Sequence, residues 1–107
     1  MNTDSQKVGL LHLTDKNLKL INSSVLKPNY DRSNLNAGIL HIGVGNFHRA
    51  HLSWYTHCLM QKELAYNWAI IGSGVTEYDL QMREKLKKQD YLTTLIELDP
   101  KGNQSCE

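Results

Sequence analysis

The sequence predicts an α/β fold in which three parallel strands alternate with two helices. Residues 39–44, 68–74 and 91–98 are short runs rich in apolar or β-forming side chains. Between them, residues 47–61 and 78–89 carry apolar side chains at helical spacing. The order is therefore β-α-β-α-β, and right-handed crossovers are expected to place the strands in the order 3-2-1, which is half of a doubly wound sheet.

The chain before the first strand is expected to be an arm that lies outside the sheet. Thr14 is placed to cap a short helix over about residues 15–22, in which Leu18 and Ile21 share one side. Residues 27–34 then combine a proline with Asn, Asp and Ser, a composition typical of a loop. We therefore assign residues 1–38 to an N-terminal arm with a short helix.

The first strand runs directly into two glycines, which is the arrangement that a phosphate-binding turn requires. Gly43 can make the tight turn, and Gly45 lacks a Cβ, so an anion can approach the main chain there. The amides from about Asn46 to His48 begin the following helix and have no intrahelical partner. This strand–turn–helix order predicts a dinucleotide site. The competing interpretation is that the two glycines form only a turn.

The start of the first helix departs from the G-x-G-x-x-G pattern. His48 stands in the place of the third glycine, and Ala50 is the nearest small side chain that could take over close packing. His48 and His51 are three residues apart, so a metal pair must be considered. Since no further ligand is near, we expect no metal site and place His48 at the turn or in packing.

A carboxylate after the second strand is expected to bind the adenosine ribose diol. Residues 68–74 are continuously apolar, as in a parallel strand covered on both faces, and Glu77 and Asp79 follow. Asp79 comes later than the usual spacing of about 20 residues. An equally supported interpretation is that Asp79 caps the helix over 78–89. No Arg or Lys lies between Gly74 and Asp79, which favours NAD over NADP.

The third strand, 91–98, is followed by a turn at residues 99–102. Three strands leave two open edges and an incomplete core. The predicted fold is thus the N-terminal half of a Rossmann-type doubly wound parallel sheet, incomplete, with residues 39–107 as a partial dinucleotide-binding domain.

Charge and cysteine content exclude several other classes of protein. Lys and Arg number 12 and Asp and Glu number 11, so no basic excess favours nucleic acid. No apolar run approaches the roughly 20 residues that cross a bilayer, and the polar start lacks a signal-peptide core. Cys58 and Cys106 form no C-x-x-C motif, so we expect a reducing, cytoplasmic location, with Cys58 buried and Cys106 exposed.

Three stretches together resemble the mannitol dehydrogenase family. They are Gly43–His51, Trp68–Gly74, and Met82-Arg83 with Gln89–Leu95; the resemblance covers about residues 14–102 and includes His48 in place of a glycine. It implies a mannitol 2-dehydrogenase-like, NAD-dependent oxidoreductase that interconverts a polyol and a ketose by hydride transfer. The small-molecule substrate would be a polyol or a hexuronate.

The resemblance also implies which residues bind NAD, and it marks Asp79 as the discriminator for this cofactor. The implied cofactor-binding residues are Ile42, Gly43, Val44, Gly45, Asn46, Phe47, His48, Arg49, Ala50 and Asp79. The lysine base of such enzymes lies in a later helical domain, which we expect to be absent from these 107 residues. Lys101 is not that lysine, and no catalytic residue is assigned.

Three alternatives remain open at this point. The first is a fructuronate or tagaturonate reductase of the same family. The second is a non-catalytic, truncated product, because half a sheet should bind a dinucleotide weakly. The third is a methyltransferase, since that class also places a G-x-G after its first strand and an acid after its second.

Overall fold

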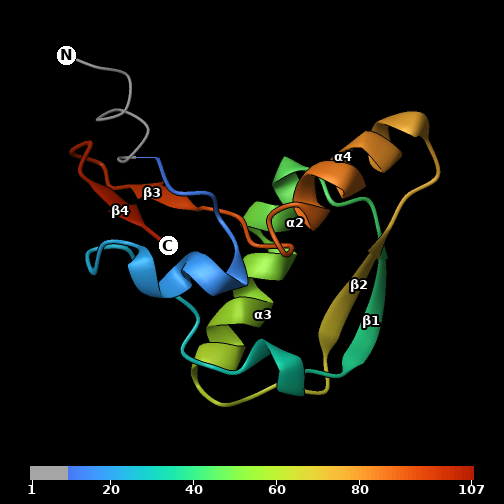
Figure 1. The fold of residues 1–107 in the computed structure, drawn as a ribbon, viewed down its shortest axis with the longest axis horizontal. Helices are drawn as coiled ribbons and strands as arrows, with labels where there is room; N and C mark the ends of the chain where they lie inside the picture. The colour runs from blue at the N-terminus through green and yellow to red at the C-terminus, as the bar shows by residue number, and fades with distance from the viewer. Residues whose placement is uncertain (1–9) are drawn as a thin grey trace. The chain divides into compact units, whose positions relative to one another are not determined.

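The computed structural model describes residues 10–107, and the chain divides into two compact units (Figure 1). One unit is Pro28–Glu84. The other combines Lys85–Glu107 with the described part of Met1–Lys27. The polar start of the chain, residues 1–7, lies outside the described residues. The division into an arm over 1–38 and a dinucleotide-binding part over 39–107 stays a prediction.

A pair of parallel strands forms the sheet of the unit Pro28–Glu84. Strand β1 is Ala37–Ile42 and strand β2 is Ala69–Ser73, with Leu40 opposite Ile71. β1 therefore begins two residues before the predicted strand and ends before Gly43. The parallel arrangement agrees with the predicted crossover, because a helical segment separates the two strands in the chain.

Two helices replace the single helix that was predicted over residues 47–61. Helix α2 is Asn46–Ala50 and helix α3 is Leu52–Gln61. The break is at His51, whose backbone (φ −121°, ψ −84°) is not helical. Neither glycine nor proline marks this position in the sequence, so helical spacing alone could not reveal the break. A short 3-10 helix, η2 (Arg32–Asn34), precedes β1 and is capped by Asp31.

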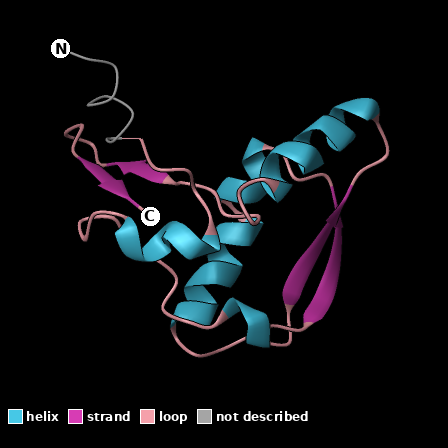
Figure 2. Ribbon diagram, in the orientation of Figure 1, coloured by secondary structure: helices cyan, strands magenta, loops and turns pink. Residues whose placement is uncertain are grey.

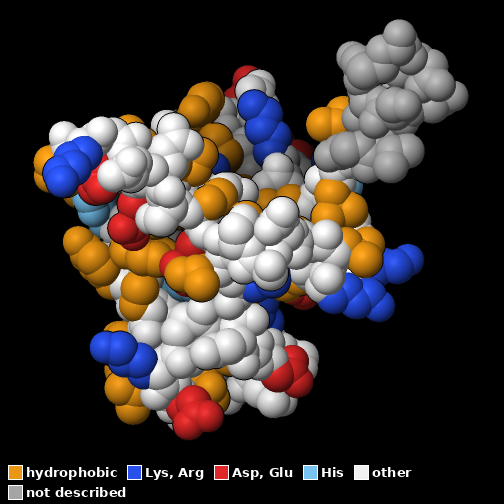
Figure 3. Space-filling view, turned by 90° about the vertical axis from the view of Figure 1, so that its left-hand side faces the viewer, with side chains coloured by type: hydrophobic (Ala, Val, Ile, Leu, Met, Phe, Trp, Pro, Cys, Tyr) orange, Lys and Arg blue, Asp and Glu red, His pale blue; other side chains and the backbone are white. Residues whose placement is uncertain are grey.

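The two-stranded sheet is covered on one face only. Figure 2 shows α2 and α3 on one side of β1 and β2. On the opposite face, Leu40, Ile42 and Ile71 are more than half exposed. The apolar pattern of 68–74 predicts cover on both faces. In this unit, by contrast, one face of the sheet formed by β1 and β2 is open. Apolar side chains also reach the surface elsewhere, as the orange atoms in Figure 3 show.

The last strand differs most from the prediction. β3 is only Ile96–Leu98, and it pairs antiparallel with β4 (Gln104–Cys106) instead of joining β1 and β2 in the order 3-2-1. Asp90 and Tyr91 have left-handed backbone angles (φ 50° and 60°), which prevents a strand from starting there. The predicted turn is present, because the Asp99 carboxylate accepts hydrogen bonds from the amides of residues 101 and 103. Because this turn connects the two segments closely, β3 pairs with β4, the strand that follows it in the sequence.

The unit that contains Lys85–Glu107 also contains the short helix predicted after Thr14. It is a 3-10 helix, η1 (Asp15–Leu20), and Thr14 makes no side-chain capping bond, so that part of the prediction is wrong. Cys58, in the other unit, and Cys106 are both half-buried and are not joined by a disulfide, whereas the sequence predicted one buried and one exposed. Helix α4 (Glu77–Lys87) follows β2, and its residues up to Glu84 belong to the unit Pro28–Glu84. Within residues 10–107, none of the helices is both long and apolar enough to cross a membrane.

Candidate cofactor site

The turn between β1 and α2 has the geometry that its two glycines predict. Gly43 has a φ of +95°, a left-handed value that side chains rarely allow, and its amide donates to the Ser73 carbonyl at 2.7 Å. Gly45 is the N-cap of α2, with φ −73° and ψ −170°. The turn is therefore fixed to the end of β2 while it redirects the chain into the helix.

Three consecutive amides at the start of α2 are not used in the hydrogen bonds of the helix. The helix begins its hydrogen bonding with the Arg49 amide, which donates to the Gly45 carbonyl at 3.1 Å. Within the described chain, the amides of Asn46, Phe47 and His48 have no hydrogen-bond partner. Unpaired amides that precede a helix favour an anion.

Gly45 differs from Gly72 and Gly74 in what surrounds it. A Cβ on Gly45 would meet no described atom within 4 Å, and its φ is one that any residue can adopt. A Cβ on Gly72 would lie 2.5 Å from Cγ1 of Val44, and a Cβ on Gly74 would clash with Cβ of Asp79. Packing thus requires glycine at 72 and 74. At Gly45 it leaves open space beside the main chain, which fits a dinucleotide that approaches there.

The other residues implied at this turn differ in how they are placed. Arg49 donates to the Asn46 side-chain oxygen, and its Nε also reaches the Gly45 carbonyl at 3.4 Å, so its guanidinium lies along the turn. Phe47 is 78% exposed. Ile42 lies on the open face of the sheet, Val44 packs beside Gly72, and Ala50 ends α2 half-buried. The turn therefore presents main-chain amides and one cation.

His48 packs behind the turn, which confirms one of the two roles expected for it. Its ring is only 7% exposed and lies 4.0 Å, centroid to centroid, from the ring of His41 on β1. Its Nε2 is 2.8 Å from Oγ of Ser53 on α3. Burial, and then the neighbouring His41 and Arg49, lower the pKa of His48, so the ring is neutral at physiological pH. His48 thus fills the space that a third glycine would leave.

Asp79 caps α4, as one of the two interpretations predicted. Its Oδ2 accepts hydrogen bonds from the amides of Val75 and Thr76, both at 3.0 Å, and from the Thr76 hydroxyl at 2.9 Å. The Thr76 hydroxyl in turn lies 3.2 Å from the Asp79 amide, which completes a capping box. These bonds, first that from the Val75 amide, lower the pKa of Asp79 and keep it ionised. Within the described chain, its Oδ1 has no partner, so a ribose diol could still bind there.

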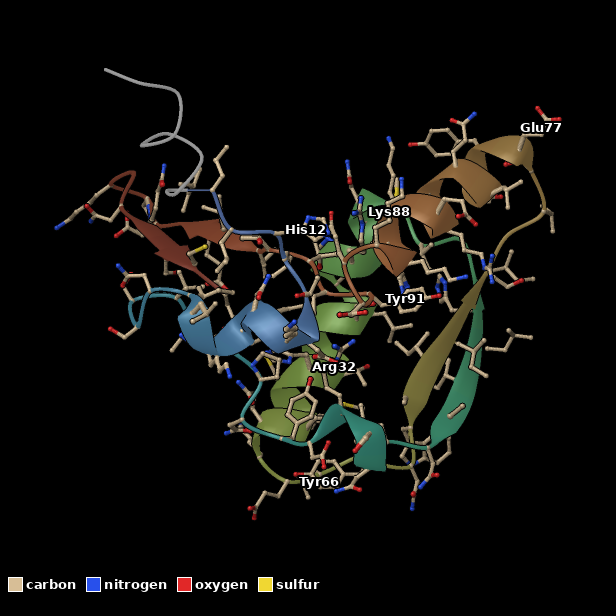
Figure 4. The ribbon with its side chains drawn as sticks, in the orientation of Figure 1. His12, Arg32, Tyr66, Glu77, Lys88 and Tyr91 are labelled. Carbon is tan, nitrogen blue, oxygen red and sulfur yellow. The ribbon has the colours of Figure 1, made fainter. Side chains whose placement is uncertain are left out.

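Glu77, the other candidate carboxylate, is placed differently. Figure 4 shows it at the outer end of α4, in the first turn. It is exposed. Asp79 is half-buried and is held by the loop that follows β2. Of the two acids, Asp79 is therefore the one with a fixed position.

The turn and the carboxylate share one edge of the sheet. Gly43–Gly45 follows β1 and Gly74–Asp79 follows β2, and parallel strands present their carboxyl ends on the same side. The contact between Val44 and Gly72, and the bond from the Gly43 amide to the Ser73 carbonyl, connect the turn to the end of β2. The structure thus brings together the two parts of the site that the sequence predicted separately.

A metal site is not found at these histidines. His48 contacts His41, whereas the His51 ring lies between Phe47 and Tyr55, at centroid distances of 4.2 and 6.3 Å. Among residues 10–107, no three His, Cys, Asp or Glu side chains are grouped to hold a metal ion.

Sequence reasoning missed two residues at this site, His41 and Thr76. Thr76-x-x-Asp79 is a capping-box pattern, so Thr76 could have been found from spacing. His41 could have been found from strand alternation, which places it on the same face as Ile39, toward the helices.

A parallel strand pair in which a glycine turn leads from β1 into a helix defines this chain as part of a Rossmann-type dinucleotide-binding domain. The sequence profile of the mannitol dehydrogenase Rossmann domain matches residues 37–105, and the chain belongs to that family. The predicted family and fold class are thereby confirmed.

Individual relatives agree with this assignment. The chain is 52% identical over 82 residues to mannitol 2-dehydrogenase of Cereibacter sphaeroides, a match that covers 77% of this chain and 17% of the relative. Its structure is similar to Pseudomonas fluorescens mannitol 2-dehydrogenase, solved as a ternary complex with NAD and D-mannitol. The TM-score is 0.84 at 38% identity, over 90% of this chain and 20% of that one. A substrate-free D-sorbitol dehydrogenase matches with a TM-score of 0.76 at 35% identity, over 88% and 19% of the two chains. The chain thus spans about one fifth of the length of these relatives.

Proposed function

We propose that this chain is the NAD-binding part of a polyol dehydrogenase that interconverts a polyol and a ketose by hydride transfer. The observation that carries the proposal is the pairing of an open glycine turn at Gly45 with an anchored carboxylate at Asp79, in a chain of the mannitol dehydrogenase family. The relative solved with NAD and D-mannitol supports the choice of cofactor and substrate class.

In this proposal the diphosphate of NAD lies against the amides of Asn46, Phe47 and His48, with Arg49 adding a positive charge. The free Oδ1 of Asp79 accepts hydrogen bonds from the adenosine ribose, while its charge repels a 2′-phosphate. Ile42, Val44 and Ala50 complete the predicted set by shaping the turn. When bound, NAD supplies the hydride acceptor; the described residues bind and orient it.

The substrate is proposed to be a polyol, with a hexuronate as the alternative within the family. No catalytic residue is proposed within the 107 residues. A reducing, cytoplasmic location is part of the same proposal, and two free cysteines fit such a compartment.

Binding to the chain itself tests the cofactor. In an ¹⁵N NMR titration, we expect NAD⁺ to shift the amide signals of Gly45 to Arg49 and of Asp79, with a smaller response to NADP⁺. Weak binding is measurable by this method. A response to S-adenosylmethionine in place of NAD⁺ would favour the methyltransferase alternative, and no response to either ligand would contradict the proposal.

Turnover tests the substrate. The complete protein that contains these residues should be assayed with NAD⁺ and a panel of polyols, and with NADH and fructose, fructuronate or tagaturonate. Activity with mannitol and fructose supports the proposed function. Activity confined to the uronates would assign it to the reductase alternative, and the absence of turnover with all of them would overturn it.

A further inference from the structure

Two stacked histidine rings lie directly behind the proposed dinucleotide site. His41 belongs to β1 and His48 to α2, and their ring planes are inclined by 33° at a centroid distance of 4.0 Å. His41 is half-buried and His48 is buried. The pair therefore joins the strand that enters the turn to the helix that leaves it.

Each ring is also tied to the backbone or side chain of a neighbouring element. Nδ1 of His41 lies 2.8 Å from the Gly43 carbonyl. Since a carbonyl only accepts, this nitrogen carries the proton and donates it. Nε2 of His48 lies 2.8 Å from Oγ of Ser53 on α3. The Gly43 carbonyl, within the turn, is thus bonded to a ring that stacks on His48.

The remaining nitrogen of His48 has no partner. Nδ1 is buried and makes no hydrogen bond within the described chain. In the neutral ring it can remain a bare lone pair, at modest cost. In the protonated ring it becomes a buried N–H without an acceptor, which destabilises the folded chain by the desolvation free energy of that group.

The charged groups near His48 act in the same direction. His41 faces it from β1 and Arg49 approaches it from α2, while the contact from α3 is the uncharged Ser53. None of these contacts is a carboxylate that would stabilise an imidazolium. Protonation of His48 would therefore introduce repulsion as well as an unsatisfied donor.

We propose that His41 and His48 are positioning residues of the dinucleotide site: the stacked rings hold the Gly43 carbonyl and the Gly43–Gly45 turn, and protonation of His48 releases it. The inference rests on the proposed function, since it takes this turn to be the place where NAD binds. It predicts that NAD affinity falls as the solution becomes acidic.

NMR on the chain of residues 1–107 tests the coupling without a ligand. The ring nitrogens of His48 and the amides of Gly43 and Gly45 are followed from pH 8 to pH 5. We expect the glycine amide signals to move with the same midpoint as the His48 ring. Glycine signals that stay constant while His48 titrates, or that follow a different group, would overturn the inference.

Variants test its consequence for binding. We expect the wild-type dissociation constant for NAD⁺ to rise at least about tenfold between pH 8 and pH 5.5. His48→Gln keeps a donor for Ser53 but has no titratable ring. Its dissociation constant for NAD⁺ should therefore change less than about threefold over the same pH range. His41→Phe keeps an aromatic ring but loses the bond to Gly43, and should bind about tenfold more weakly already at pH 8, the equivalent of one strong hydrogen bond.

His12→Gln is the matched control, since Nε2 of His12 contacts the Lys88 carbonyl in the other unit, where both residues are labelled in Figure 4. It should retain the wild-type affinity and pH profile. A wild-type pH profile in His48→Gln would overturn the inference. If the wild-type chain binds no NAD⁺ at pH 8 while the glycine amides still follow His48, the proposed function fails and the coupling between the pair and the turn stands.

Discussion

Thr76 and Asp79 hold each other in both directions at the start of α4. The Asp79 carboxylate accepts from the amide and the hydroxyl of Thr76, at 3.0 and 2.9 Å, and the same hydroxyl lies 3.2 Å from the Asp79 amide. All of the bonds to the carboxylate use Oδ2. Oδ2 thus caps the helix, and Oδ1, which makes no hydrogen bond within the described chain, is the oxygen proposed to accept from the ribose.

Removal of the Thr76 hydroxyl should destabilise α4 and loosen Asp79. We expect Thr76→Ala to lower the free energy of unfolding by about 1 kcal/mol, the usual contribution of an N-cap side chain. Thr76→Ser keeps the hydroxyl and serves as the control. Urea denaturation of the three proteins measures the difference. Equal stability of Thr76→Ala and the wild type would show that the capping box contributes nothing.

Acid should weaken the same cap. Because the pKa of Asp79 is lowered in the folded chain, its contribution to stability is present above about pH 4 and is lost as the pH falls through that lowered value. Asp31 and Asp99 have lowered pKa values as well and contribute with the same sign. The informative measurement is therefore the difference in the free energy of unfolding between wild type and Asp79→Asn over pH 6 to 2.5. This difference should become smaller as the pH falls. A difference that stays constant would contradict the role of the ionised Asp79 carboxylate as a cap.

The two turn glycines should respond differently to a methyl group. Gly43→Ala forces a side chain into a left-handed backbone and should cost about 1–2 kcal/mol of folding free energy. Gly45→Ala enters open space, so it should cost less than about 1 kcal/mol, as Ala is only a poorer N-cap.

Binding should show a second difference at Gly45. If NAD approaches the main chain there, Gly45→Ala lowers the affinity at least about tenfold, or about 1.4 kcal/mol, although the protein stays folded. Thermal unfolding and an NAD⁺ titration of the same sample separate the two effects. Unchanged affinity in Gly45→Ala would place the diphosphate elsewhere.

Cofactor choice should depend on Asp79 and not on Glu77. We expect Asp79→Ala to weaken NAD⁺ binding about tenfold and to reduce the preference over NADP⁺, because an acceptor for the ribose diol and a repulsive charge are both lost. Glu77→Ala removes a carboxylate two residues away, from the exposed first turn of α4, and is the matched control. If the two variants had equal effects, the preference for NAD⁺ would depend on the overall negative charge near the site and not on Asp79 in particular.

The local elements were predictable to the extent that neighbouring residues specify them. Gly43 at a positive φ and Asp79 as a helix cap follow from short patterns whose physics is local, and the parallel pair of β1 and β2 follows from the crossover rule for a β-α-β unit. The break at His51 and the pairing of β3 with β4 were not predictable in this way. No residue near His51 signals a break, and strand pairing depends on which partner is available.

The sequence by itself determined the class of this protein, because the glycine turn and the acid lie within longer stretches that resemble one family, and these can be recognised from order and spacing. Only the tertiary structure decided that His41 stacks on His48, that the open oxygen of Asp79 is Oδ1, and that Gly45 borders empty space. The reason is physical: these relationships join residues from different elements, and their distances are set by how strands and helices pack.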